Sequence, residues 1–393
     1  MSQQLINLSP DLRKLRDEGF DIAVQSGYLL LRNIPYLNAA SQIGRGVLVS
    51  ELTLLNATTT VRPSTHVTFF IGECPSNKDG TPIAGIVLSS ANQVISPGIL
   101  INHTLSNKPQ TGYPDYYAKM TRYVDIISAP AKSLDPNLTE KTDAPIADTD
   151  CSGVFEYIDT NSSRANVNAI NAKLAGQKIA IIGLGGTGAY ILDLVAKTPV
   201  QEIHLFDGDD FLQHNAFRSP GAASLEDLGR RFKKVDYYSG IYSKMHRGIR
   251  PHSAYLSDSN LSALDGMSFV FICIDRNSVR GLLTTHLLLK GISFVDVGLG
   301  VLPVDDCLIG TLRFTAGTAE KFDHLKSRLP AGEDAGENPY TTNIQIADLN
   351  ALNAAFAVIK WKKIMGFYQD LEKEHHSTYS INVAQLLNED CTA

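Results

Sequence analysis

The sequence predicts an α/β fold, with a doubly wound and mainly parallel sheet that follows a β-rich α+β domain. The first ~125 residues hold short β-branched runs separated by turn-forming clusters. From about residue 164 onward, strand-like runs alternate with helical patterns, which is typical of βαβ units and a parallel sheet. The stretch KIAIIGLGGTGAYILDL (178–194) runs from a β-branched strand through a glycine cluster into a helix.

The first domain is expected at residues 1–128. Its strands are predicted at four apolar runs, 28–34, 46–55, 66–73 and 84–90. Apolar residues at helical spacing predict one helix over 10–23 and another over 115–127. We expect no catalytic site here: Cys74, and the stretch with His103, Ser106 and Lys108, are better explained as polar loops than as a Cys/His or Ser/His centre.

A linker is expected over 129–163, because 129–150 is rich in Pro, Asp and Thr and shows no periodicity. The second domain is expected at 164–393. Within it, residues 341–365 carry an apolar helical stripe and predict a helix that packs on the sheet or on a dimer partner. The preceding GEDAGENPY (332–340) is interpreted as a mobile loop that receives the substrate tail.

The composition excludes several classes of function. Hydrophobic residues make up 44% and charged residues 19%, and the net charge is −6, so nothing favours a nucleic-acid or membrane partner. No apolar run approaches the ~20 residues of a membrane span, and the N-terminus does not resemble a signal peptide, so we expect a cytoplasmic protein. The five cysteines form no C-x-x-C pair, which argues against a disulfide framework or a cysteine zinc site.

The glycine cluster predicts a phosphate-binding turn. Gly183, Gly185, Gly186 and Gly188 let the backbone approach a phosphate, which the amide groups of the following helix would bind. Asp207 ends the next strand, roughly 20 residues further on, where a carboxylate can accept the ribose hydroxyls. These features fit NAD and ATP equally.

The loop after Asp207 favours ATP. FDGDDFLQHNAFRSPG (206–221) adds Asp209, Asn215 and Arg218, whereas a redox unit of this kind normally passes directly from the ribose carboxylate into a helix. A polar loop that ends in an arginine is not required for binding a dinucleotide.

Taken in order, these motifs resemble the adenylating domain of the ThiF/MoeB and ubiquitin-activating enzyme family. GLGGTG is followed by FDGDDFLQHNAFR, KKVD (233–236) and FICIDRNSVR (271–280), and the resemblance covers about residues 164–365. It implies a homodimer that uses ATP and Mg²⁺ to adenylate the C-terminal carboxylate of a ubiquitin-like or sulfur-carrier protein, with release of pyrophosphate. Zinc-binding members carry two C-x-x-C pairs, which this chain lacks.

The resemblance also implies a role for each matching residue. The four glycines would line the nucleotide, Asp207 would hold the ribose and Asp209 would support the phosphate loop. Asn215 and Arg218 would contact the triphosphate. The remaining roles concern the α-phosphate, the metal and the second subunit: Lys234, or Lys233 in a shifted register, would neutralise the α-phosphate, Asp275 would bind Mg²⁺, Arg280 would be ancillary, and Arg164 would reach the ATP of the other subunit.

The same residues make chemical sense without the family. Attack of a carboxylate on a triphosphate brings like charges together, so cations and a metal are needed where charge builds up. Two alternatives remain open, an NAD(P)-dependent oxidoreductase and a non-catalytic nucleotide-binding adaptor. No cysteine is predicted to be a nucleophile, and Cys307, which opens an apolar run, is expected to be buried and structural.

Overall fold

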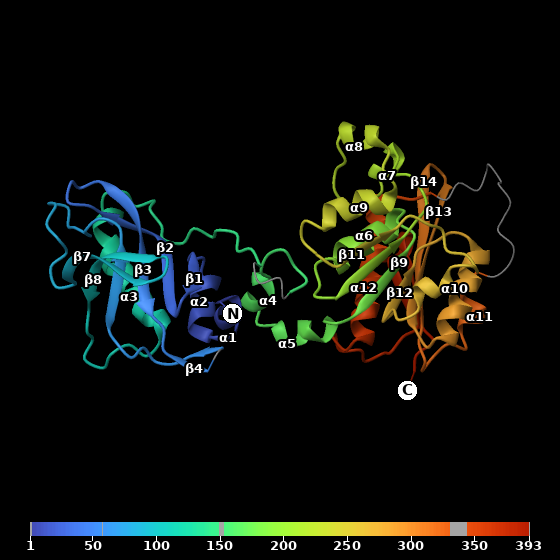
Figure 1. Cartoon of the computed structure of the whole chain (residues 1–393). Helices are drawn as coiled ribbons and strands as arrows, with labels where there is room; N and C mark the ends of the chain where they lie inside the picture. Colours follow the sequence, from blue (N-terminus) through green and yellow to red (C-terminus); the bar gives the residue numbers. More distant parts are fainter. Residues whose placement is uncertain (1, 57, 149–152, 331–343, 393) are drawn as a thin grey trace. The chain divides into compact units, whose positions relative to one another are not determined.

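The computed structural model describes residues 2–56, 58–148, 153–330 and 344–392. They fall into two compact units, residues 1–150 and 151–393 (Figure 1). The expected loop 332–340 and Cys151 lie outside the described residues. Each unit has its own hydrophobic core and is described by itself.

The first unit is a six-stranded antiparallel sheet with helices, in the strand order β1-β2-β3-β6-β8-β7. Helix α3 packs against β2, and Tyr116, Tyr123 and Ile127 from α3 share the core with Leu29 and Leu31 from β2. The elements are α1 (Ser2–Leu8), α2 (Pro10–Asp17), β1 (Ile22–Gln25), β2 (Tyr28–Leu37), β3 (Ile43–Glu51), β4 (Leu54–Asn56), β5 (Thr59–Thr60), β6 (Val67–Ile71), β7 (Val87–Ser96), β8 (Ile99–Ser106) and α3 (Tyr116–Lys132).

Two details of the first domain differ from the prediction. The helix expected over 10–23 ends at Asp17, because residues 22–25 are drawn into antiparallel pairing with β2. The stretch interpreted as a polar loop around His103 begins with strand β8, in which Ile99, Ile101, His103 and Leu105 alternate inward. The alternation is blurred in the sequence because Leu100 is apolar on the outward side and His103 is polar on the inward side.

Both ends of the segment expected to be a linker are helical. Helix α3 runs to Lys132, whose ammonium pairs with Glu140 at 2.6 Å. Lys141 pairs with Glu18 at 2.9 Å, so this part of the chain packs back on the first unit. The segment ends in a short helix, α4 (Thr160–Arg164), of the second unit.

The second unit confirms the predicted doubly wound, mainly parallel sheet. The strand order is β11-β10-β9-β12-β13-β14-β15-β16, parallel from β11 to β13 and antiparallel beyond. The α-helices are α5 (Asn168–Asn171), α6 (Gly186–Val195), α7 (Gln213–Ala216), α8 (Leu225–Arg230), α9 (Lys234–Tyr242), α10 (Asn277–Leu289), α11 (Leu325–Arg328) and α12 (Ala347–Ile364). The strands are β9 (Lys178–Ile182), β10 (Glu202–Phe206), β11 (Ile249–His252), β12 (Phe269–Ile272), β13 (Ser293–Val304), β14 (Cys307–Gly317), β15 (His376–Ser380) and β16 (Gln385–Glu389); three short 3-10 helices span Ala172–Leu174, Leu261–Leu264 and Ile381–Val383.

Helices cover both faces of this sheet. Ile179 and Ile181 of β9 share one core with residues of α6 and α12, whereas Ala180 and Ile182 share another with Leu283 of α10. Strand β9 is therefore a continuous apolar run, because both of its faces are buried. Among the described residues, no helix is both long and apolar enough to cross a membrane.

The strand order reverses at β9. From β9 the chain moves outward through β10 to β11 and then returns to the other side of β9 to form β12 and β13. Loops at the carboxyl ends of β9 and β12 diverge at such a point and leave a crevice, where α/β proteins bind their ligands.

Candidate functional site

A cavity of about 720 Å³ opens at the carboxyl ends of these strands. Nine of the residues that were given a role from the sequence line it: Gly183, Gly185, Gly186, Asp207, Asp209, Arg218, Lys234, Asp275 and the ancillary Arg280. Gly188, Asn215 and Arg164 are not among the lining residues. The sequence motifs, which span almost 100 residues, thus come together at the carboxyl ends of the strands.

The glycine turn is closely packed on one side and open on the other. A Cβ on Gly186 would lie 2.0 Å from Nδ2 of Asn350, and one on Gly188 would lie 1.8 Å from the carbonyl oxygen of Gly183. A Cβ on Gly185 would meet no atom within 4 Å, so this residue faces open space at the start of α6. Gly188 therefore contributes through packing, while the amide end of α6 faces the cavity.

Asp207 joins the glycine turn to the next loop. Its side chain is 7% exposed and accepts hydrogen bonds from the backbone N–H of Leu184 (2.7 Å) and of Asp209 (2.8 Å). A carboxylate can accept about four hydrogen bonds, so these two leave capacity for ribose hydroxyls.

Of the two neighbouring lysines, Lys234 belongs to the cavity. It begins α9, is 6% exposed, and its ammonium lies 2.6 Å from Asp209 and 3.6 Å from Asp207. Lys233 instead pairs with Asp210 at the surface, at 2.7 Å, and does not line the cavity. The geometry therefore favours the register with Lys234.

Asp209 is held as a carboxylate. Partial burial tends to raise its pKa, but hydrogen bonds from Lys234 and from the hydroxyl of Tyr255 together hold the pKa below the usual range. The hydrogen bond between Tyr255 and Asp209 also raises the pKa of Tyr255 to about 12. Tyr255, which also lies under Arg276 in a cation–π contact, was not predicted from the sequence.

Arg218 lines the cavity. Its backbone oxygen accepts a hydrogen bond from Asn350 (3.4 Å), while its Nε is buried and finds no partner in the described part of the chain. Asn215 has a local role: its Oδ1 accepts from the backbone N–H of Leu212 at 2.9 Å. The Nδ2 of Asn215 is also buried and unpartnered within the described ranges.

Asp275 follows β12 and is exposed to the cavity. In the described residues it forms no ion pair, and no group of three or more His, Cys, Asp or Glu could enclose a metal. A single free carboxylate fits Mg²⁺, which typically binds one or two carboxylates and takes its other ligands from phosphates and water.

The cysteines correct one prediction. Cys307 is exposed rather than buried, because the β13–β14 hairpin extends beyond its neighbours and Leu308 and Ile309 beside it are also exposed. Cys273 lines the cavity, and burial raises the pKa of its thiol, which disfavours a nucleophile. In the first unit, burial raises the pKa of the Cys74 thiol.

Several cavity residues were missed: Arg276 lies inside the 271–280 motif but was given no role, and the others lie outside the motifs. The fold brings them to the same place from loops, a strand and a helix: Tyr255, Arg276 and Gln345 lie in loops, Arg313 on β14 and Asn353 on α12. The polar pair Asn350 and Asn353 on one face of an otherwise apolar helix is the one usable signal.

Comparison with known proteins confirms the resemblance for the second unit. Residues 160–303 match the ThiF family, and residues 10–160 match a domain of unknown function, DUF6791. No curated protein matches the chain.

Solved structures with a similar fold include PaaA, at 18% identity over 59% of this chain and 78% of that one, with a TM-score of 0.46. They also include E. coli MccB with ATP, at 16% identity over 57% of this chain and 67% of that one, with a TM-score of 0.47. MccB in complex with N-formylated MccA is 17% identical over 58% of this chain and 69% of that one, with a TM-score of 0.46.

Proposed function

We propose that this chain, whose residues 160–303 match the ThiF family, is an adenylating enzyme that activates the C-terminal carboxylate of a substrate with ATP. One observation carries the proposal. Five separate segments of the chain line a single cavity with a glycine turn, the buried carboxylate of Asp207, two cations and the exposed carboxylate of Asp275. A cavity of about 720 Å³ lies within the usual range for small-molecule sites.

In this reaction a carboxylate oxygen attacks the α-phosphorus of ATP. A bond forms between that oxygen and phosphorus, the bond from the α-phosphorus to the bridging oxygen breaks, and pyrophosphate leaves. Arg218 and Lys234 would offset the charge that builds on the phosphates. Asp275 would hold Mg²⁺, which supplies further positive charge at the phosphate oxygens.

The finer parts of the proposal rest on the family resemblance. The substrate would be a ubiquitin-like or sulfur-carrier protein, and the enzyme would act as a homodimer. The oxidoreductase alternative leaves Arg218 and Lys234 without a role, while the adaptor alternative keeps the same site without turnover.

Binding separates these alternatives first. ATP with Mg²⁺ should stabilise the protein against heat, by about 2.7 kcal/mol at 100 times the dissociation constant. NAD and FAD should not shift the melting temperature. A shift with NADH and none with ATP would overturn the proposal.

Turnover is tested by ATP–pyrophosphate exchange with candidate proteins that end in a free carboxylate. Arg218→Ala and Asp275→Asn should each lower exchange about a hundredfold while the protein stays folded. Bound ATP without exchange for any candidate would favour the adaptor.

A further inference from the structure

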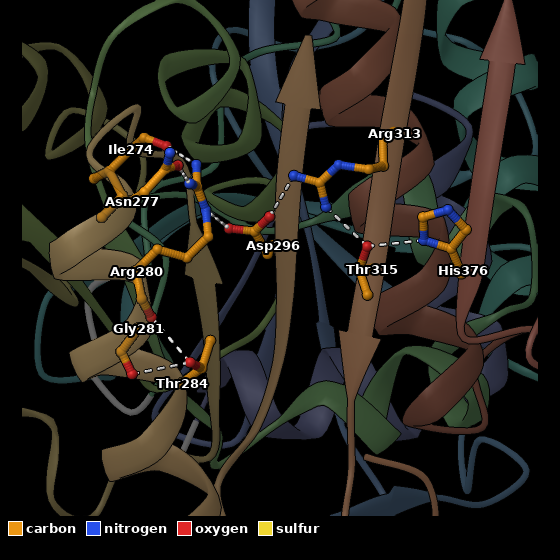
Figure 2. Close-up of polar contacts among 9 residues, drawn as sticks. All are labelled: Ile274, Asn277, Arg280, Gly281, Thr284, Asp296, Arg313, Thr315 and His376. Carbon is orange, nitrogen blue, oxygen red and sulfur yellow. Dashed lines mark hydrogen bonds and ion pairs between the residues drawn. The ribbon is translucent and has the colours of Figure 1, made fainter. Parts of the chain in front are cut away.

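A fully buried carboxylate lies behind the cavity wall, between two arginines. Asp296 of β13 is 0% exposed and accepts hydrogen bonds from Nε of Arg280 and from Nη2 of Arg313, each at 2.8 Å (Figure 2). One carboxylate thus faces two guanidinium groups, so this cluster carries a surplus positive charge. A buried charge is tolerated when it is paired and hydrogen-bonded in this way.

The two arginines differ in how fully they are occupied. Arg280 is buried and also donates to Asn277 and, at 2.5 Å, to the carbonyl of Ile274, the residue before Asp275. Arg313 donates from Nη1 to Thr315 at 2.8 Å, and Thr315 lies 3.0 Å from Nδ1 of His376. The remaining N–H groups of Arg313 have no partner among the described residues, and the Arg313 side chain is 16% exposed at the cavity wall.

The wall beside Arg313 is shaped by Gly298, its cross-strand neighbour on β13. A Cβ on Gly298 would lie 2.7 Å from Nη2 of Arg313, so the guanidinium lies directly against this glycine. The carbonyl of Gly298 accepts a hydrogen bond from Nδ2 of Asn353 at 3.1 Å. Asn353 is 1% exposed and lines the same cavity, yet its Oδ1 has no partner in the described ranges. A buried, unpartnered acceptor of this kind calls for a donor from a ligand.

We propose, building on the adenylation function above, that Arg313 binds the carboxylate of the acyl donor and that Asp296 and Thr315 position it. A guanidinium matches a carboxylate with paired hydrogen bonds. Arg218 and Lys234 follow β10 in the chain, whereas Arg313 lies on β14, which three strands separate from β10 in the sheet, so Arg313 would serve as a separate cation for the second anion. The Oδ1 of Asn353 would accept a hydrogen bond from a backbone amide N–H of the peptide substrate. The ligand class is therefore a peptide carboxyl terminus.

The test uses triglycine as the probe and triglycinamide, in which a neutral amide replaces the carboxylate, as its match. Ligand-observed saturation-transfer NMR measures their affinities for the full chain loaded with Mg²⁺ and a nonhydrolysable ATP analogue. Triglycine should bind, and triglycinamide should bind at least about tenfold more weakly. Arg313→Gln should remove this preference for the carboxylate. Equal affinity for the two probes, or no binding of triglycine to the wild-type protein, would overturn the proposal.

The positioning role needs variants that keep the fold. Asp296→Asn removes the carboxylate between two buried arginines and is expected to lower stability strongly, so Thr315 offers a cleaner pair. Thr315→Val removes the acceptor for Arg313 and should lower the preference for triglycine, whereas Thr315→Ser keeps the hydroxyl and should retain it. A purely structural role would leave the preference unchanged in both variants.

Failure of this inference and failure of the proposed function give different results. If the ATP analogue does not raise the melting temperature of the wild-type protein, the adenylation proposal fails. If the analogue stabilises wild-type and Arg313→Gln proteins equally but neither prefers triglycine, only the role of Arg313 fails. The melting temperature measured without ligands confirms that each variant is folded.

Discussion

At the scale of single residues, Lys233 and Lys234 are neighbours with opposite surroundings. Lys234 is buried against Asp209 and Asp207 on the cavity wall. Lys233 is exposed and pairs with Asp210. Because charges act more strongly where water is excluded, only one of the two lysines can contribute much to binding of a triphosphate.

Replacing Lys234 by Ala should weaken ATP binding at least about tenfold, because it removes a cation and leaves two carboxylates facing the phosphates. Replacing Lys233 by Ala should change the affinity less than about twofold. Titration calorimetry with MgATP compares the two variants directly. Equal losses in both would mean that Lys234 has been assigned the wrong role.

Several of the residues that the sequence identified lie just after a strand or begin a helix. Asp207 and Asp275 come after β10 and β12, and their type and position together suggest their chemistry. Asp296 and Asn353 could not be found in this way. The proposed role of Asp296 depends on hydrogen bonds from Arg280 and Arg313, which are 16 and 17 residues away in the sequence. No local sequence pattern indicates that these three residues come together in the fold.

At the scale of elements, the glycine turn depends on helix α12, more than 150 residues further along the chain. Asn350 of α12 fills the space beside Gly186, accepts a hydrogen bond from Thr187 at 2.9 Å, and donates to the carbonyl of Arg218. The helix that was expected to pack on the sheet thus also joins two loops of the cavity.

Gly186→Ala should lower stability by about 1–3 kcal/mol, because the new methyl group overlaps the amide of Asn350. Adding Asn350→Ala to this variant should recover part of the loss, and urea unfolding of the four proteins in the cycle measures the coupling. Gly240→Ala in α9 is the matched control. Its Cβ would meet no atom within 4 Å, and it should raise stability slightly. Additive effects of Gly186→Ala and Asn350→Ala would contradict the proposed contact.

Element boundaries show where sequence reasoning succeeds and where it fails. Strands β9 and β10 end where they were expected to, directly before the glycine turn and Asp207, because both are apolar runs that end at a turn or a carboxylate. Strand β8 was missed because Leu100 and His103 interrupt the alternation of apolar and polar residues. The burial of Cys307 was wrong, because an apolar run does not reveal that its hairpin extends past the sheet.

At the scale of the whole molecule, buried histidines make stability depend on pH. Burial is the main cause that lowers the pKa of six of them: His103, His246, His252, His324, His375 and His376. The unfolded chain therefore takes up protons at a higher pH than the folded chain does. Stability should fall as the pH drops through the unfolded pKa of 6.5, and it should continue to fall until the folded histidines also become protonated.

Five of the six belong to the second unit, so the loss on acidification should be larger there than in the first unit. Scanning calorimetry between about pH 7.5 and pH 5.5 follows the transitions of both units. His246 donates to the carbonyl of Val200 and accepts from the backbone of Gly248, so it fits only as a neutral ring. His246→Gln should flatten the dependence on pH. Stability that rises on acidification would contradict a destabilising role for these protonated histidines.

An assembly of two chains is tested through Arg164, which ends helix α4 and does not line the cavity of its own chain. If Arg164 reaches the ATP of a second subunit, Arg164→Ala and Asp275→Asn subunits should restore part of the exchange activity when mixed. In such a mixed dimer, one of the two sites contains both intact residues. Verified mixed dimers with no recovery of activity would exclude this role.

The hydrogen bonds of Asp207 have a consequence for how a nucleotide enters. Because this carboxylate already binds the amides of Leu184 and Asp209, the two loops are joined in the protein alone. Binding of ATP would then require little ordering of the backbone, so a smaller share of the interaction energy is lost to conformational entropy. The nucleotide binds to a preorganised site, so the folding of a loop around it should not limit the rate of association.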